Sequence, residues 1–274
     1  MKLSLRQIIN NAKNYLKDDF VIEDIYWIIE EEFGLEKYQI LLNMDSIYDD
    51  NEIMNKVKRA VKEPVGYIFG YQYFGPFKIQ INKNVLIPRQ ETFELVNIVC
   101  EYIKENNLNI LDIGTGSGCI AIALEQLLKE KKLKEHILAS DISSNALEVA
   151  KQNAFNFNSS ISFVQSDVLS NITLDKIDII ISNPPYIKKG NYIATRVLDN
   201  EPHSALFADE DGLEFYHKII SQSLKFNSKI SYFFEISPDL EEGLVELQKK
   251  YLPSHRMILK KDINGFIRFC LIVV

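Results

Sequence analysis

The sequence has few of the residues that hold metals or cross-link small domains, with three cysteines and four histidines among its 274 residues. Cys100, Cys119 and Cys270 lie far apart, and no two of them have the Cys-x-x-Cys spacing of a zinc or redox motif. We therefore expect neither a disulfide framework nor a metal site, and a reducing, cytoplasmic compartment.

Two further absences limit the partners. No apolar run approaches the roughly 20 residues of a membrane span, and the first residues lack the apolar segment of a secretory signal. A basic excess is also missing, because 31 Lys and Arg stand against 38 Asp and Glu, for a formal net charge of -7. We expect no membrane association and no direct nucleic-acid partner, since the overall charge does not attract phosphates.

The remaining composition is that of an ordinary folded protein, 46% hydrophobic and 25% charged. The length suits one large domain and one small one, and we expect a monomer. Glycine is almost absent from residues 1–62, where apolar residues recur at helical spacing. This pattern predicts a domain of about four short helices, which we interpret as a substrate-docking module. Its apolar positions include Ile8, Ile9, Ala12, Ile25, Ile28 and Ile29.

The character of the sequence changes after Pro64. Residues 67–75 are aromatic and contain glycine, and residues 77–81 alternate polar and apolar with period two. This arrangement predicts a β-hairpin linker over residues 63–88. The third predicted domain spans residues 89–274.

From residue 109 onward, strand and helix patterns alternate, which predicts a mainly parallel sheet covered on both faces. The predicted strands are residues 109–113, 136–140, 161–165, 178–182 and 229–236. A C-terminal antiparallel hairpin follows over residues 256–261 and 265–273, with Asn264-Gly265 as its turn. The fold class is thus α/β and Rossmann-like, with a small helical domain in front.

A glycine-rich turn follows the first of these strands. Gly114, Gly116 and Gly118, with Thr115 and Ser117 between them, connect this strand to a helix, where the backbone can closely approach a ligand. The turn also satisfies a relaxed dinucleotide fingerprint, so by itself it leaves a nicotinamide-dependent oxidoreductase open.

Acidic residues at the strand ends help to distinguish a nicotinamide dinucleotide from a cofactor that carries an ammonium group. Asp141 ends the second strand, where a carboxylate can accept hydrogen bonds from ribose hydroxyls in either case. Asp112 precedes the glycine turn, where it suits the ammonium of S-adenosyl-L-methionine (SAM) and repels a pyrophosphate. Asp167 ends the third strand and is the candidate for the adenine edge, with Val168 packing beside it. A turn-forming role for Asp167 remains open.

The fourth strand ends at Asn183-Pro184-Pro185-Tyr186. Two consecutive prolines cannot continue a strand ladder, because neither has an N–H to donate. The strand must therefore end in a stiff loop at the sheet edge where ligands of open α/β folds bind. An amide side chain, backbone carbonyls and an aromatic ring at this position are suited to hold a flat group that has N–H donors.

Together, these motifs resemble a class I SAM-dependent N-methyltransferase. Four further segments narrow this resemblance: residues 64–70, 86–92, 201–206 and 211–213. Together they resemble the bacterial release factor glutamine N5-methyltransferase family (PrmC, also called HemK), and the resemblance covers nearly the whole chain. Two departures are the residues Gln90 and Phe93 where the family has Pro and Glu, and Val168 where an aromatic residue is common.

The resemblance implies SAM as the methyl donor and the glutamine side-chain amide of the Gly-Gly-Gln loop in peptide-chain release factors as the acceptor. We expect the Asn183 side-chain oxygen and the Pro184 carbonyl each to accept one N–H of that amide, with Tyr186 packed against its plane. Such positioning can lower a barrier by roughly 7–11 kcal/mol. Pro185 and Arg89 complete the expected substrate site, and Asn183 also borders the cofactor. Arg89 as a plain surface cation remains open.

Other functions share parts of this pattern. A nucleic-acid methyltransferase acting on an exocyclic adenine or guanine amine uses the same Asn-Pro-Pro-Tyr loop, but it needs base flipping and a phosphate-neutralising surface. A nicotinamide-dependent oxidoreductase would bind its cofactor through the glycine turn, but the double proline would then have no function. A non-catalytic SAM-binding scaffold leaves the intact Asn183 unexplained.

Overall fold

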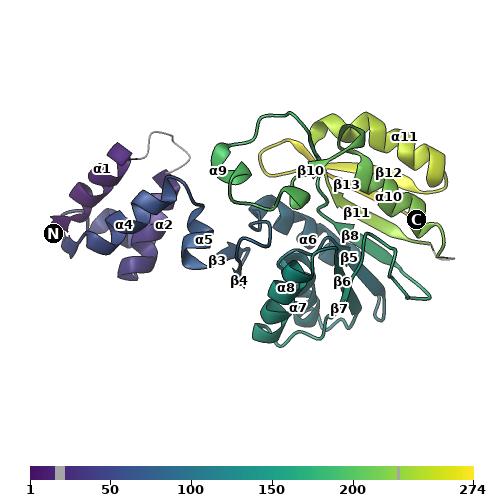
Figure 1. Cartoon of the computed structure of the whole chain (residues 1–274). Coiled ribbons are helices and arrows are strands. Elements are labelled where there is room, and N and C mark those ends of the chain that lie inside the picture. The colour runs from purple at the N-terminus through teal and green to yellow at the C-terminus, as the bar shows by residue number, and fades with distance from the viewer. Residues whose placement is uncertain (16–21, 227–228) are drawn as a thin grey trace. The chain divides into compact units, whose positions relative to one another are not determined.

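The computed structural model describes residues 1–15, 22–226 and 229–274, and its elements are labelled in Figure 1. The chain forms two compact units. The first comprises Met1–Gly70 and Ile193–Asn200, and the second comprises Tyr71–Tyr192 and Glu201–Val274. The predicted boundaries of 1–62, 63–88 and 89–274 remain a proposal.

The first unit is built from short amphipathic helices. The apolar positions that the sequence places at helical spacing are buried in one cluster, among them Ile8, Ile25 and Ile28. A short antiparallel pair of β1 with β2 brings the segment before α1 beside the segment before α4, and this pair was not expected from the sequence. Its elements are β1 (Lys2–Ser4), α1 (Leu5–Tyr15), α2 (Ile22–Phe33), α3 (Lys37–Leu42), β2 (Ile47–Asp49), α4 (Asn51–Ala60), α5 (Val65–Phe69) and α9 (Thr195–Leu198).

Helix α9 belongs to this unit although it comes more than a hundred residues later in the chain. Arg196 Nη1 donates to Asp24 Oδ2 at 2.6 Å and to the Ala60 carbonyl at 3.0 Å. The Asn200 side chain donates to the Lys62 carbonyl at 2.8 Å. These polar contacts hold the segment against α2 and the end of α4.

The predicted hairpin is present but shorter than expected. Within the predicted linker of residues 63–88, the segment before the hairpin is helix α5 (Val65–Phe69), which was not expected from the sequence. The Pro64 carbonyl accepts from the N–H groups of Tyr67 and Ile68, and Gly70 ends the turn with φ 77°. The antiparallel pair is β3 (Tyr71–Phe74) and β4 (Phe77–Gln80).

A seven-stranded sheet forms the centre of the second unit, in the order β12-β13-β11-β8-β5-β6-β7. Strands β11, β8, β5, β6 and β7 are parallel, and β13 pairs antiparallel with β11 and with β12. The predicted parallel sheet with a C-terminal antiparallel hairpin is confirmed. Its strands are β5 (Asn109–Ile113), β6 (His136–Asp141), β7 (Ser162–Gln165), β8 (Ile179–Ser182), β11 (Ser231–Glu235), β12 (Arg256–Lys261) and β13 (Ile267–Val273).

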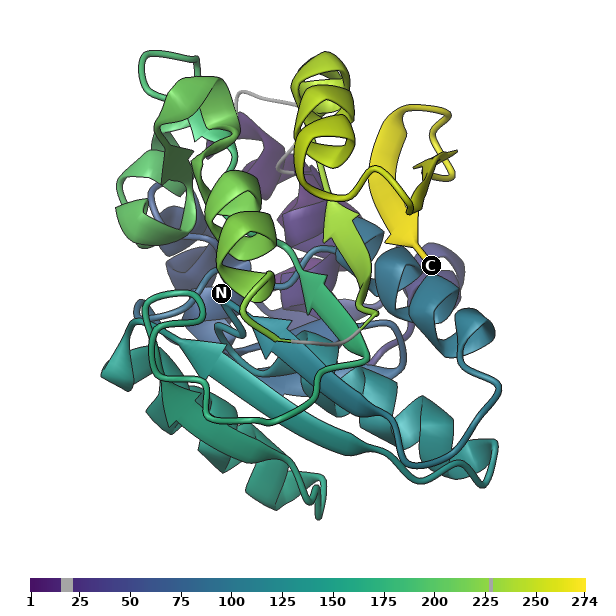
Figure 2. The same ribbon diagram turned by 90° about the vertical axis from the view of Figure 1, so that its right-hand side faces the viewer.

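Helices cover both faces of the sheet, with α6, α7 and α8 on one side and α10 and α11 on the other (Figure 2). None of the described helices has the length and apolar character needed to cross a bilayer. The helices are α6 (Gln90–Tyr102), α7 (Cys119–Glu130), α8 (Ser144–Asn156), α10 (Glu214–Ser223) and α11 (Glu241–Tyr251). Smaller elements are β9 (Ile187–Lys188), β10 (Phe207–Ala208), and single turns at His203–Ala205, Glu210–Gly212 and Pro238–Leu240.

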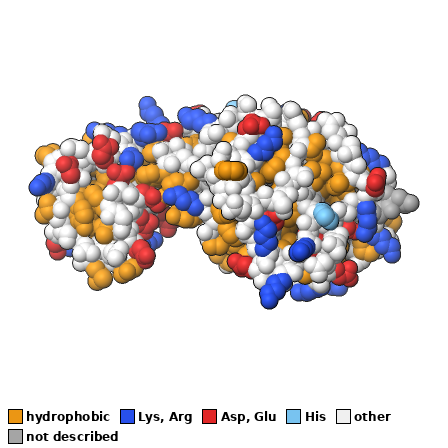
Figure 3. Space-filling model, turned by 90° about the horizontal axis from the view of Figure 1, so that it is seen from below, with side chains coloured by type: hydrophobic (Ala, Val, Ile, Leu, Met, Phe, Trp, Pro, Cys, Tyr) orange, Lys and Arg blue, Asp and Glu red, His pale blue; other side chains and the backbone are white. Residues whose placement is uncertain are grey.

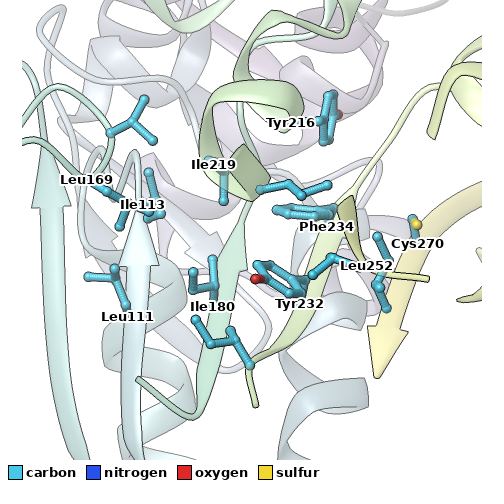
Figure 4. Close-up of a cluster of buried hydrophobic side chains, with 14 of the residues drawn as sticks. Leu111, Ile113, Leu169, Ile180, Tyr216, Ile219, Tyr232, Phe234, Leu252 and Cys270 are labelled. Atoms are coloured by element: carbon cyan, nitrogen blue, oxygen red, sulfur yellow. The ribbon is translucent and has the colours of Figure 1, made fainter. Parts of the chain in front are cut away.

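The core between the sheet and α10 is aliphatic and aromatic (Figure 4). Tyr216 and Phe234 are both fully buried and meet edge to face, with ring centroids 5.4 Å apart. The cysteines Cys100, Cys119 and Cys270 are buried free thiols. This packing fixes β8 and β11, and therefore the positions at which the two strands end.

Candidate active site

A cavity of about 250 Å³ lies at the carboxyl ends of the parallel strands in the second unit. The predicted site residues contribute from four successive strand ends. Six of the predicted residues do not line the cavity: Asp112, Thr115, Ser117, Gly118, Tyr186 and Arg89. Predicted residues that line the cavity are Gly114, Gly116, Asp141, Asp167, Val168, Asn183, Pro184 and Pro185.

The three glycines of the turn have two different roles. Gly114 and Gly116 have φ 71° and 55°, and a Cβ added to either would meet nothing within 4 Å, because both border open space at the cavity. Gly118 has φ 80°, and a Cβ there would lie 3.1 Å from the Ala150 Cβ. The first two glycines thus leave room for a ligand, and the third allows α7 to pack closely on α8.

Asp141 connects the glycine turn to the next strand. Its Oδ2 accepts from the Gly116 N–H and its Oδ1 from the Ser143 N–H, each at 2.9 Å. Burial raises the pKa of this carboxyl, and the backbone hydrogen bonds to Ser143 and Gly116 oppose the shift. Each oxygen keeps a further lone pair for a diol in the cavity.

Asp112 is fully buried beneath the turn. Its Oδ2 accepts from the Thr115 hydroxyl at 2.6 Å. Burial raises the pKa of Asp112 to about 7, against the effect of the Thr115 hydrogen bond. The carboxyl thus orders the glycine turn from below, while its contact with an ammonium group stays a prediction.

The third strand end supplies Asp167, which is exposed, and Val168, which is buried. Val168 has φ 50°, a left-handed conformation that a β-branched residue rarely adopts. The backbone therefore turns sharply here and brings Val168 to the cavity wall. Ile142 and Phe215 also line the cavity and were not expected from the sequence.

The Asn-Pro-Pro-Tyr loop is held by a hydrogen-bond network. Asn183 Nδ2 donates to Thr92 Oγ1 at 3.1 Å, and the Thr92 hydroxyl donates to Glu235 Oε2 at 2.6 Å. The Tyr186 hydroxyl lies 3.5 Å from Glu235 Oε1, and burial with this neighbouring carboxyl raises the pKa of Tyr186. No role in the site was predicted for Thr92 or Glu235 from the sequence. The one available indication was a glutamate directly after the apolar run Tyr232-Phe233-Phe234, a position where a buried strand rarely has a charge.

Arg89 and Glu201 form an ion pair beside the cavity. Arg89 Nη2 donates to Glu201 Oε1 at 2.5 Å, and the Ile87 N–H donates to Oε2 at 3.1 Å. The Glu201 side chain is fully buried, whereas that of Arg89 is 39% exposed. Glu201 therefore orders the loop before α6, and the assignment of Arg89 to substrate binding stays a prediction. His203 is exposed.

Gln90 and Phe93, which depart from the family pattern at the start of α6, pack against the β3–β4 hairpin. Gln90 accepts from the Gly75 N–H at 3.1 Å and donates to the Tyr73 carbonyl at 2.7 Å. The Phe93 ring lies so close to Gly75 that a Cβ there would meet it at 2.3 Å. Both residues therefore hold the hairpin and do not border the cavity.

The sheet, the glycine turn and the loop define a methyltransferase of class I. Residues 96–206 match the family described as Methyltransferase small domain. The N-terminal domain of human METTL16, solved in complex with SAH, is 20% identical with a TM-score of 0.51, covering 86% of this chain and 87% of that chain. This likeness shows the fold alone.

Closer relatives identify the family. The release factor glutamine methyltransferase of Streptococcus pneumoniae is 41% identical over 211 residues, covering 75% of this chain and 73% of the relative. The enzyme of the same name from Flavobacterium psychrophilum is 39% identical over 267 residues, covering 90% of each chain. The chain belongs to the release factor glutamine methyltransferase family.

Proposed function

We propose that this protein transfers a methyl group from SAM to the side-chain amide nitrogen (N5) of the glutamine in the Gly-Gly-Gln motif of peptide-chain release factors. Family membership supports the reaction, and the orientation of one side chain supports the acceptor. Asn183 turns its Nδ2 toward Thr92, so its Oδ1 is available to accept from an amide N–H. This is the observation that carries the proposal.

The residues around the cavity fit SAM, which supplies an electrophilic methyl group on a sulfonium when bound. The open space beside Gly114 and Gly116 suits its aminoacyl portion, because no side chain enters it. The two oxygens of Asp141 suit the ribose diol. Asp167 and Val168 suit the adenine edge and face.

Asn183 and Pro184 then position the acceptor. An amide nitrogen is a weak nucleophile because its lone pair is delocalised into the carbonyl. Accepting both of its N–H groups, at Asn183 Oδ1 and at the Pro184 carbonyl, aims the nitrogen at the cavity and stabilises the positive charge that develops there. Tyr186 packs against the amide plane, with its hydroxyl near Glu235. No strong base is required, since the nitrogen becomes acidic as it gains charge.

The helical residues 1–62 serve as the docking module for the release factor, in a cytoplasmic protein that acts as a monomer. Nucleic acid is not the expected acceptor. On the face shown in Figure 3, Lys and Arg side chains are interspersed with Asp and Glu instead of forming one basic stripe. The formal net charge of -7 also gives no help to phosphate binding.

Labelled SAM, incubated with the protein and either a release factor or total nucleic acid, tests this proposal. We expect label in the release factor, and none when its Gly-Gly-Gln glutamine is replaced by alanine. Label confined to nucleic acid would keep the methyltransferase reaction but contradict the proposed acceptor.

A further inference from the structure

Thr92, Asn183 and Glu235 come from three separate elements that meet at one end of the sheet. Phe234 in β11 pairs with Ser182 in β8, so Glu235 and Asn183 are the next residues at the ends of two neighbouring parallel strands. Thr92 lies in the first turn of α6 and is 3% exposed. Its hydroxyl bridges the two strand ends.

The protons in this bridge have only one consistent arrangement when Glu235 is ionised. A carboxylate can only accept, and a threonine hydroxyl has one proton to donate. The Thr92 proton is used at 2.6 Å on Glu235 Oε2, so Thr92 can offer Asn183 only lone pairs. The Asn183 amide must therefore direct its NH₂ group to Thr92, at 3.1 Å, and its oxygen away.

We infer that Thr92 and Glu235 are positioning residues, which fix the Asn183 amide so that its oxygen faces the acceptor amide. This inference rests on the proposed function, because only an acceptor with N–H donors requires that orientation. An Asn183 amide turned by 180° would present an NH₂ group to the acceptor's N–H, which cannot form a hydrogen bond. Neither Thr92 nor Glu235 needs to touch the substrate.

A proton on Glu235 removes this constraint. The protonated carboxyl can donate to Thr92, whose own proton is then free to point at the Asn183 oxygen. Burial raises the pKa of Glu235 to about 7, while the Thr92 hydrogen bond and the positive charge of Arg268 oppose the shift. Glu91 in α6 and Tyr186 in the loop also face this carboxyl.

Three substitutions separate the hydrogen-bond logic from simple packing. Glu235→Gln keeps the shape but gives the side chain an NH₂ group that can donate to Thr92, so both amide orientations become available. Thr92→Val keeps the volume and removes the hydroxyl, and Thr92→Ser restores the hydroxyl. We expect kcat to fall about ten-fold in the Gln and Val variants, equivalent to about 1.4 kcal/mol, and to stay within about two-fold in the Ser variant.

Tyr216→Phe is the matched control. The Tyr216 hydroxyl donates to the Glu235 backbone carbonyl at 2.8 Å and does not touch its carboxyl group. This variant should keep the kcat of the wild type. All four variants should bind S-adenosylhomocysteine with a Kd within about two-fold of the wild-type Kd, because none of the three substituted residues lines the cavity. The kcat of the wild type should rise with pH through about 7 as Glu235 ionises, and Glu235→Gln should lack that rise.

A second readout does not depend on the acceptor. The side-chain NH₂ resonance of Asn183, assigned by its loss in Asn183→Ala, should shift in Thr92→Val and Glu235→Gln and remain in place in Thr92→Ser. Unchanged resonances, or wild-type kcat and pH profile in the Val and Gln variants, would overturn the inference. A wild-type protein that leaves the Gly-Gly-Gln glutamine unmethylated, with the resonance shifts as expected, would instead contradict the proposed function.

Discussion

Replacing Asp141 by asparagine should weaken cofactor binding strongly, because both oxygens of this carboxylate are already in use. Oδ1 and Oδ2 each accept one backbone N–H at 2.9 Å, from Ser143 and Gly116. An asparagine offers one oxygen, so its NH₂ group must face one of these two donors. The same substitution removes the negative charge that we assign to the ribose diol.

The size of the effect follows from these two losses. A donor left unsatisfied costs about 1–3 kcal/mol, and a hydrogen bond to a charged group contributes about 1.5–3 kcal/mol. Only part of the cost of the unsatisfied donor acts on cofactor binding. We therefore expect the binding free energy to weaken by at least about 2 kcal/mol, which is about a thirty-fold rise in Kd.

Calorimetric titration with S-adenosylhomocysteine measures this change directly. Glu148→Gln removes the same charge from an exposed position on α8 and should leave Kd within about two-fold. A folded Asp141→Asn protein that binds with a Kd within about three-fold of the wild type would refute the assignment of Asp141 to the cofactor.

Three further predictions concern the stability of the scaffold and are tested by chemical denaturation. Gly118→Ala should cost about 2 kcal/mol of unfolding free energy, because φ is 80° and the new Cβ would lie 3.1 Å from the Ala150 Cβ. Phe234→Ala, at a fully buried position, should cost about 3–5 kcal/mol, whereas Phe155→Ala on the surface should change stability by less than about 0.5 kcal/mol. Glu235 has a folded pKa of about 7, above its ordinary value of 4.5, so the native state retains this proton while the unfolded chain loses it. Stability should therefore fall as pH rises from about 4.5 to 7, and Glu235→Gln should reduce that fall; an equal slope in both proteins would contradict it.

The parts of the fold that depend on local pattern were predictable. The β-branched run before Asn183 and the double proline after it specify where β8 ends, because proline cannot continue the ladder. The turn at Asn264-Gly265 likewise places the C-terminal hairpin, with Gly265 at φ 87°. In both cases a few neighbouring residues determine the backbone.

The parts that depend on distant contacts were not predictable. Helix α5 has only five residues, and its aromatic composition is as compatible with a strand. Helix α9 joins the first unit through Arg196 and Asp24, which are 172 residues apart in the chain. Thr92 is separated from Asn183 by 91 residues and from Glu235 by 143, and no sequence periodicity connects them.

Mapping the methylated residue tests the central claim most directly. A release factor treated with SAM and the protein would be digested, and its peptides analysed by mass spectrometry beside a reaction with Asn183→Ala. We predict one added methyl group on the glutamine of Gly-Gly-Gln with the wild type, and none with Asn183→Ala even though that variant still binds S-adenosylhomocysteine. A methyl group on another residue, or undiminished methylation by Asn183→Ala, would contradict the proposed role of the Asn-Pro-Pro-Tyr loop.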